Sequence, residues 1–380
     1  MSHPEELNRL NAEISSHFGH LGKCLIYVLS LYVYGVVMVR HCGQTQVTTF
    51  LSGLLGYSYY TMRQRLRELT YDSVDKRGDR RKALEVSDCF APLLGWILSK
   101  FRGQQRQVVL ALDATTLRDR FVILSVSVVV LGCAIPVAWH IQEGGRKGKW
   151  NPIWQRLVAS LIPAIPDHWS VYALTDSGLY AKPLYAYLTQ HCGWHVFMRT
   201  NISDGLFKPK GTTQWHPIHH WLTQGMSPTV LQGTCFQTNP IDCTLILLWD
   251  ADCQNPCILL TNLAPQDITD NVYTLRYWIE CGFKDIKRGL FHWEQTKMTC
   301  PKRAERLWLV LSIALVWVTT IGQQALDDPQ WACLRATETQ ARRLSAPVLG
   351  WIARLVALCK QQPVPIGYLN PYVWHSIPEP

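Results

Sequence analysis

A short segment near residue 280 carries residue types that could act together on phosphate groups. It has the pattern of an α-helix, and at ~100° per residue four of its polar side chains fall within roughly 60° of one another. These four are Tyr273, Arg276, Glu280 and Lys287. A neighbouring apolar stripe would bury the helix, and its members are Leu275, Ile279, Phe283, Ile286 and Leu290. A carboxylate beside fixed cations suits a site for metal ions and phosphate, whereas a solvated edge of i,i+3 and i,i+4 charge pairs is the alternative.

Two aspartates could complete such a site. Asp113 ends the short apolar run Val108–Leu112, and Asp176 ends another, Val171–Thr175. Side chains at the carboxyl ends of strands in an open sheet face the crevice where ligands bind, so both could converge with Glu280. Three oxygen ligands suit Mg²⁺ or Mn²⁺, and two such ions can activate a nucleophile and stabilise the leaving oxygen in phosphoryl transfer. Strand-end aspartates that only cap the next helix are the alternative.

The elements around these acids predict an α/β fold. Three strands that read as antiparallel are followed by alternating helices and strands, which indicates a mixed five-stranded sheet with helices on its faces. The expected strands are Val108–Leu112, Phe121–Val130, Cys133–Ile141, Val171–Thr175 and His195–Arg199, and the expected helices are Pro152–Leu161, Lys182–His191 and Lys302–Gly322.

Two other regions have different predicted secondary structure. Residues 1 to about 100 look helical, and within them Thr48–Ser58 and Tyr60–Leu69 read as helix, glycine turn and basic helix. That pattern is compatible with a helix-turn-helix whose second helix enters a major groove. Residues 203–264 contain the strand-like runs Thr229–Phe236, Cys243–Trp249 and Cys257–Asn262, which predict a β-rich insertion.

Length and composition limit the number of domains, the partners and the cellular compartment that we expect. The chain has 380 residues, enough for two or three domains, and its net charge of +9 favours polyanionic partners. The odd number of cysteines, 13, and the lack of an N-terminal signal pattern indicate reduced thiols in a cytoplasm. Leu25–Val39 and Leu307–Ile321 are about 15 residues each, short of the ~20 that span hydrocarbon. We therefore expect buried core helices and no membrane partner, and a transmembrane protein is the alternative.

Cysteine and histidine clusters are weaker candidates for chemistry. Seven, nine and three residues separate Cys235, Cys243, Cys253 and Cys257, and this spacing does not match the paired ligands of structural zinc sites. A second cluster consists of His216, His219 and His220, for which we expect packing roles.

The quoted residues resemble a known family. The spacing Tyr273-x2-Arg276-x3-Glu280-x6-Lys287 is similar to the YREK signature of bacterial insertion-sequence DDE transposases of the hairpin-forming group. The surroundings of Asp113 (Leu112–Thr116) and of Asp176 (Leu174–Gly178) look like those of the family's two aspartates, and the β-rich insertion has a similar place and length. The resemblance covers about residues 105 to 325. It implies an RNase H-like catalytic core of the retroviral integrase superfamily.

The resemblance also implies roles for single residues. Asp113, Asp176 and Glu280 would be catalytic metal ligands for two Mg²⁺ or Mn²⁺ ions. The DNA-binding residues would be Tyr273, Arg276 and Lys287, of which the guanidinium and ammonium groups neutralise and orient phosphates. The implied reaction is cut-and-paste transposition. Water frees a 3′-hydroxyl, which attacks the opposite strand to form a hairpin; water reopens the hairpin, and the hydroxyl then attacks target DNA.

The implied partners are the element's terminal inverted repeats and target DNA, both double-stranded, bound by a homodimer when two ends are paired. The implied location is the bacterial cytoplasm, in association with the nucleoid. We expect an N-terminal helical end-binding domain (1–104), a core in two parts (105–202 and 265–325) around the insertion (203–264), and a partly helical tail (326–380).

Two departures from the family pattern leave details open. Ser177 stands where many members have a basic residue, and Cys257 stands before the last insertion strand where relatives have a tryptophan that stabilises a flipped base. Trp215, Trp221 or Trp249 could take that role. The alternative functions are an RNase H-like nuclease such as a resolvase, and a transposase-derived DNA-binding protein without catalytic activity.

Overall fold

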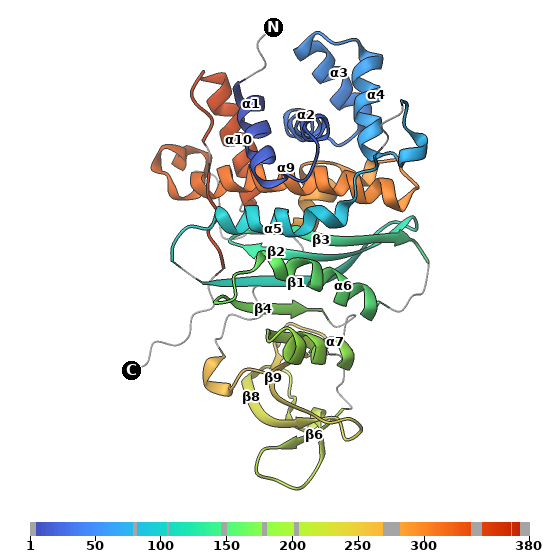
Figure 1. Cartoon of the computed structure of the whole chain (residues 1–380). Coiled ribbons are helices and arrows are strands. Elements are labelled where there is room, and N and C mark those ends of the chain that lie inside the picture. Colours follow the sequence, from blue (N-terminus) through green and yellow to red (C-terminus); the bar gives the residue numbers. More distant parts are fainter. Residues whose placement is uncertain are drawn as a thin grey trace.

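A ten-stranded mixed sheet runs through the protein, with helices packed against one half of it (Figure 1). The computed structural model describes residues 5–78, 82–104, 106–145, 150–176, 181–200, 205–268, 282–335, 344–365 and 367–372. The helices in these ranges are α1 (Glu5–His17), α2 (Lys23–Val39), α3 (Gln44–Leu55), α4 (Tyr59–Thr70), α5 (Phe90–Ser99), α6 (Asn151–Leu161), α7 (Lys182–Ala186), α9 (Pro301–Asp327) and α10 (Ala346–Cys359). The strands are β1 (Gln107–Leu117), β2 (Phe121–Val130), β3 (Cys133–Glu143), β4 (Ser170–Thr175), β5 (His195–Thr200), β6 (Leu206–Pro209), β7 (His216–Pro217), β8 (Met226–Cys235), β9 (Ile241–Trp249) and β10 (Cys257–Thr261).

The strand order is β3-β2-β1-β4-β5-β10-β9-β8-β6-β7. Strands β1, β4 and β5 are parallel, whereas β2 is antiparallel to both β1 and β3. The mixed α/β class is therefore confirmed. The sheet is wider than predicted, because β10 pairs antiparallel with β5 and the insertion strands extend the same sheet. This pairing also covers the edge of β5, which would otherwise expose unpaired backbone groups.

Helix α9 forms the centre of the helical layer. It packs against α2, α10 and β3, and its length and apolar composition would allow it to span a membrane, although 83% of its most apolar stretch is buried inside the protein. Both apolar runs noted in the sequence lie in buried helices, the first in α2 and the second in α9. Helix α10 approaches α9 closely, since a Cβ on Gly322 would lie 1.7 Å from the carbonyl oxygen of Ala346.

Polar side chains of α9 fix its neighbours. The Glu305 carboxylate accepts a hydrogen bond from the backbone N–H of Ile141 at 2.8 Å and contacts His140 Nδ1 at 3.0 Å. This gives a partner to one backbone N–H group of β3, the strand at the edge of the sheet. Arg306, only 3% exposed, donates to the carbonyl oxygens of Thr70 and Leu84, each at 2.9 Å. Strand β3 and the segment after α4 are therefore both anchored to one turn of α9.

The first four helices share one continuous core with the sheet and α9. Helix α3 ends at Gly56, whose φ of 68° suits glycine, and α4 begins after Ser58, whose hydroxyl accepts from the N–H of Thr61 at 3.2 Å. The predicted arrangement of helix, glycine turn and basic helix is therefore present. Entry of α4 into a DNA groove and the domain boundaries stay predictions.

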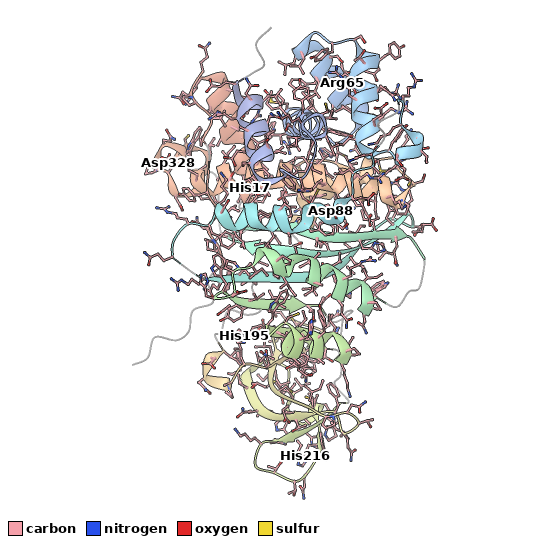
Figure 2. The ribbon with its side chains drawn as sticks, in the orientation of Figure 1. His17, Arg65, Asp88, His195, His216 and Asp328 are labelled. Carbon is pink, nitrogen blue, oxygen red and sulfur yellow. The ribbon has the colours of Figure 1, made fainter. Side chains whose placement is uncertain are left out.

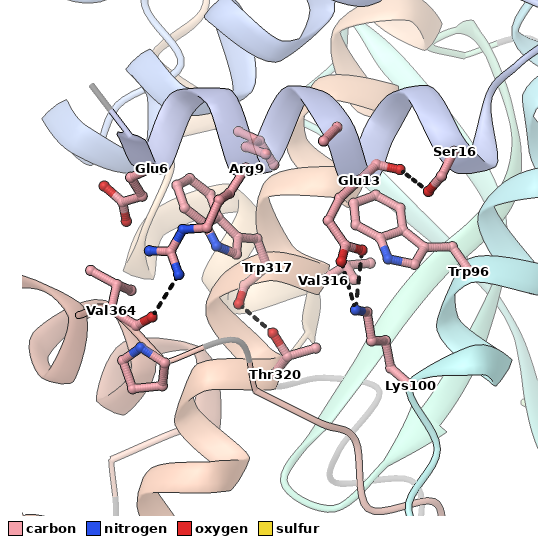
Figure 3. Close-up of a pocket in the computed structure, with 13 residues that line it drawn as sticks. Glu6, Arg9, Glu13, Ser16, Trp96, Lys100, Val316, Trp317, Thr320 and Val364 are labelled. Carbon is pink, nitrogen blue, oxygen red and sulfur yellow. Dashed lines mark hydrogen bonds and ion pairs between the residues drawn. The ribbon is translucent and has the colours of Figure 1, made fainter. Parts of the chain in front are cut away.

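A cavity of about 350 Å³ lies between α1, α5 and α9 (Figure 3). Trp96 and Trp317 form apolar walls, and Lys100 forms an ion pair with Glu13 at 3.1 Å. Arg9 donates to the carbonyl oxygen of Val364 at 3.3 Å. These contacts tie α1 to α5 and to the segment that follows α10.

One buried arginine joins four helices. Arg354 of α10 is 1% exposed and forms a two-armed ion pair with Glu6 of α1. Its guanidinium carbon also lies 4.9 Å from the ring centroid of Trp317 on α9 and 5.6 Å from that of Tyr34 on α2. The desolvation cost of both charges is offset only while both partners are present.

We expect Arg354→Met to lower the free energy of unfolding by about 3–5 kcal/mol, because it leaves the Glu6 carboxylate buried without its partner. The double variant Glu6→Leu/Arg354→Met should lose less than Arg354→Met alone, since neither charge remains. Denaturant titration measures both. A double variant at least as unstable as Arg354→Met alone would contradict this account.

Candidate functional site

The pairing of β1 with β4 places Asp113 next to Asp176. The two strands are parallel, and their last paired residues are Leu112 and Thr175. Each aspartate is the next residue along its strand direction, so the two carboxylates occupy neighbouring positions at one level of the sheet. The prediction that β1 ends at Asp113 is wrong: β1 continues to Leu117 because it stays paired with β2 beyond this point. The pairing of β1 with β4, in contrast, does end just before Asp113.

Arg199 occupies the equivalent position on the third parallel strand. Thr175 of β4 pairs with Met198 of β5, and Arg199 follows. Its Nη1 lies 3.5 Å from Asp176 Oδ1, and its side chain is 17% exposed. Sequence reasoning missed Arg199 as a functional residue, although an arginine at the end of an apolar strand was a visible signal. Neighbouring strands β1, β4 and β5 thus present two carboxylates and one guanidinium in a row.

Lys287 lies on the Asp113 side of this row. Its Nζ donates a hydrogen bond to the hydroxyl of Thr115, which lies two residues beyond Asp113 and therefore on the same face of β1. Burial lowers the pKa of Lys287 from its ordinary value, and the charge of Asp113 acts in the opposite direction. The Asp113 carboxylate is oriented by the backbone N–H of Ala114, which donates to its Oδ1 at 2.8 Å.

The remaining predicted residues of the site, Tyr273, Arg276 and Glu280, lie outside the described residues. Beyond residue 281, the end of the expected helix is helical and finishes in a π-helical turn at Asp285–Gly289. The described part of the predicted apolar stripe is buried, with exposed fractions of 7%, 0% and 0% for Phe283, Ile286 and Leu290. The stripe therefore does bury this segment, as expected.

The two described aspartates fit a divalent metal ion in part. Carboxylate oxygens are hard donors of the kind that Mg²⁺ and Mn²⁺ bind, and each aspartate has a cation in its surroundings that would balance its charge in the absence of a metal. Within the described residues, no group of three His, Cys, Asp or Glu side chains could hold a metal ion. A complete set of three carboxylates needs a donor from elsewhere, and the predicted one is Glu280.

A buried thiol lies close to the row. Burial raises the pKa of Cys257 to about 11, with smaller and opposing contributions from Arg199 and Asp176. At neutral pH this thiol is protonated, so it is not a strong nucleophile.

The predicted tryptophan candidates all lie on the insertion. Trp221 packs edge-on against Phe207 at 5.6 Å between ring centroids, and Lys208 Nζ lies 5.2 Å from the centroid of Trp215. Trp249 Nε1 donates to the carbonyl oxygen of Cys253 at 3.1 Å. His216 lies at the far end of the insertion from the helical layer (Figure 2). Which tryptophan could stack on a base stays a prediction.

Asp285 anchors the segment that carries Lys287. Its Oδ2 accepts a hydrogen bond from the Ser345 hydroxyl at 2.8 Å, and Ser345 is the N-cap residue of α10. Burial raises the pKa of Asp285 from 3.8 to about 6, although Ser345, Lys284 and Arg40 act to lower it. The buried surroundings of Asp285 therefore favour the protonated, neutral form of its carboxyl group.

Comparison with known proteins gives two similarities. A family model described as a transposase DDE domain matches residues 104–317. Among solved structures, the chain is similar to a piggyBac transposase in a synaptic complex with hairpin DNA, determined by cryo-electron microscopy. The identity is 12% and the TM-score 0.39, over 94% of this chain and 80% of that one; a similarity this loose says nothing about function. No curated protein matches the chain.

We expect Asp285→Asn to stabilise the protein at neutral pH relative to wild type. A raised pKa means that the stability contributed by Asp285 is fully present below about pH 4 and is lost as the pH rises through about 6. A shift of this size corresponds to about 3 kcal/mol. Unfolding free energies of both proteins, measured from pH 4 to pH 7, should diverge across this interval. A constant difference would contradict the assignment.

Proposed function

The chain belongs to the transposase DDE domain family, and from this premise we propose that it cuts DNA at the ends of an insertion sequence and joins them to target DNA. The family model spans residues 104–317, more than half of the 380-residue chain. The proposed reaction is cut-and-paste phosphoryl transfer with a hairpin intermediate. The proposed setting is the bacterial cytoplasm, at the nucleoid.

The observation that carries this proposal is the register of β1, β4 and β5. It places Asp113 and Asp176 on adjacent parallel strands at one level of the sheet, with Arg199 following on the third. Two carboxylates at the level where the pairing of β1 with β4 ends match the expected first two acids of a DDE site. The order β3-β2-β1-β4-β5, with β2 antiparallel to its neighbours, further supports an RNase H-like core.

Asp113, Asp176 and Glu280 are proposed to hold two Mg²⁺ or Mn²⁺ ions. When bound, such ions would activate the attacking oxygen and stabilise charge on the leaving oxygen. The fit rests on the two described carboxylates, whose hard oxygen atoms suit these ions. No protein nucleophile is needed, because water and a DNA 3′-hydroxyl are the attacking groups.

The cations around the acids are proposed to act on phosphate. Arg199 keeps Asp176 in place at 3.5 Å and can turn toward a phosphate oxygen once metal neutralises the carboxylate. Lys287 is positioned by Thr115, so its ammonium group would meet a phosphate at a defined place. Tyr273 and Arg276 are proposed to hold the same transposon end.

The proposed partner is double-stranded DNA, as terminal inverted repeats and as target. Because two ends must be brought together before they are joined, we propose a homodimer in the DNA-bound state. The net charge of +9 supports a polyanionic partner.

We expect Asp113→Asn, Asp176→Asn and Glu280→Gln each to reduce cleavage of DNA that carries the ends of the element by at least about 10²-fold, while duplex binding is kept. These changes remove negatively charged oxygen donors but leave the cations that contact phosphate. Strand cleavage and strand transfer are measured in Mg²⁺ on DNA that contains the sequences flanking the reading frame.

The control is Asp88→Asn, an exposed acid before α5 (Figure 2), which should leave cleavage unchanged. Near-normal cleavage by any one of the three site variants would rule out the assignment of that residue. Cleavage without strand transfer by the wild-type protein would favour a resolvase-like nuclease instead.

We expect Lys287→Gln to weaken binding to the ends and to lower the slope of log affinity against log salt by about 1, because one phosphate contact is lost. Thr115→Val removes the hydroxyl that holds Lys287 but keeps the charge, so it should weaken binding while the salt slope stays closer to that of wild type. An equal slope for wild type and Lys287→Gln would argue against direct phosphate contact.

A further inference from the structure

A groove of about 640 Å³ separates the N-terminal helices from the start of α9. One wall is a face of α4 together with the beginning of α3, and the other is the segment from Gln295 to Arg303. In Figure 1, α3 and α4 stand beside one end of α9. Sequence reasoning did not identify residues 295–303 as functional.

The described residues that line this groove include four arginine and lysine side chains and no aspartate or glutamate. Arg63 and Arg67 come from α4, whereas Lys297 and Arg303 come from the opposite wall. Asp75 balances Arg303 at 3.1 Å, and Arg67 Nε donates to the neutral hydroxyl of Tyr71 at 2.7 Å. Three of the four cations therefore have no carboxylate partner among the described residues.

Neutral donors accompany these charges. Helix α3 is 12 residues long and begins in the groove, and the preceding Gly43 offers no side-chain cap. The first backbone N–H groups of α3 are therefore available to an anion, with the helix dipole favouring negative charge. The groove is also lined by uncharged polar side chains, namely Gln44, Thr45, Gln46, Gln295, Thr296 and Thr299.

The groove is firmly connected to the candidate active site. The N–H of Cys42 donates to the carbonyl oxygen of Phe291 at 2.8 Å, and Arg40 Nη2 donates to that of Gly289 at 2.6 Å. Arg120 of the β1–β2 turn donates to the carbonyl oxygen of Met298, a residue that lines the groove, at 2.9 Å. An anion in the groove would thus be held in a fixed relation to both Lys287 and β1.

We propose that this groove holds the phosphate backbone of duplex DNA next to the catalytic row, an inference that rests on the proposed function above. Cations that face one another across an open groove, with neutral donors between them and no carboxylate among the described lining residues, suit successive phosphates of one strand. Arg63 and Arg67, one turn apart on α4, contact the backbone from one side, and Lys297 contacts it from the other.

The test compares two double variants of the full chain. Arg63→Gln/Lys297→Gln removes one exposed cation from each wall, whereas the control Lys23→Gln/Lys360→Gln removes two exposed cations that do not line the groove. Affinity for a short random-sequence duplex DNA is measured over a series of salt concentrations. The groove variant should lower the slope of log affinity against log salt by about 2, and the control should leave it unchanged.

The outcomes separate the two proposals. If wild type binds with a steep salt dependence and both variants behave alike, the groove assignment is overturned while the proposed function stands. If wild type does not bind duplex DNA, both fall. A duplex RNA of the same sequence that binds more tightly than DNA through the same residues would overturn the choice of partner.

Discussion

The candidate active site depends on the register between three parallel strands. Leu112, Thr175 and Met198 lie side by side on β1, β4 and β5, and each is followed by one member of the row Asp113, Asp176 and Arg199. Because side chains alternate between the two faces of a sheet, a slip of one residue in β4 would turn Asp176 to the other face. All three strands are buried along most of their length.

The same row explains how two aspartates can lie close together before any metal binds. Arg199 stands 3.5 Å from Asp176, and Lys287 reaches the Asp113 side through Thr115. Arg199 comes from β5 of the sheet itself and Lys287 from the segment Asp285–Gly289, so charge balance is part of the fold. In the proposed function these cations are already positioned where phosphate must arrive, which reduces the reorganisation needed on binding.

The N-terminal helices are structurally joined to this region. They share the buried core of α9 and the sheet, and the α2–α3 loop is hydrogen-bonded to residues 289–295. Arg354 of α10 also joins α1, α2 and α9 through its contacts with Glu6, Tyr34 and Trp317. A region predicted to recognise DNA ends is thereby coupled to the segment that carries Lys287 by direct contacts.

The sequence by itself determined the α/β class and the approximate strands, because local apolar patterns depend only on neighbouring residues, and it predicted Asp113 and Asp176 as site residues. It also indicated the burial of Phe283, Ile286 and Leu290 from helical spacing. Only the tertiary structure decided that β10 joins β5 to continue the sheet, that Arg199 stands beside Asp176, and that residues 295–303 face α4 across a basic groove. These are contacts between residues far apart in the chain, and no local periodicity encodes which strand pairs with which, or which helix face meets which loop.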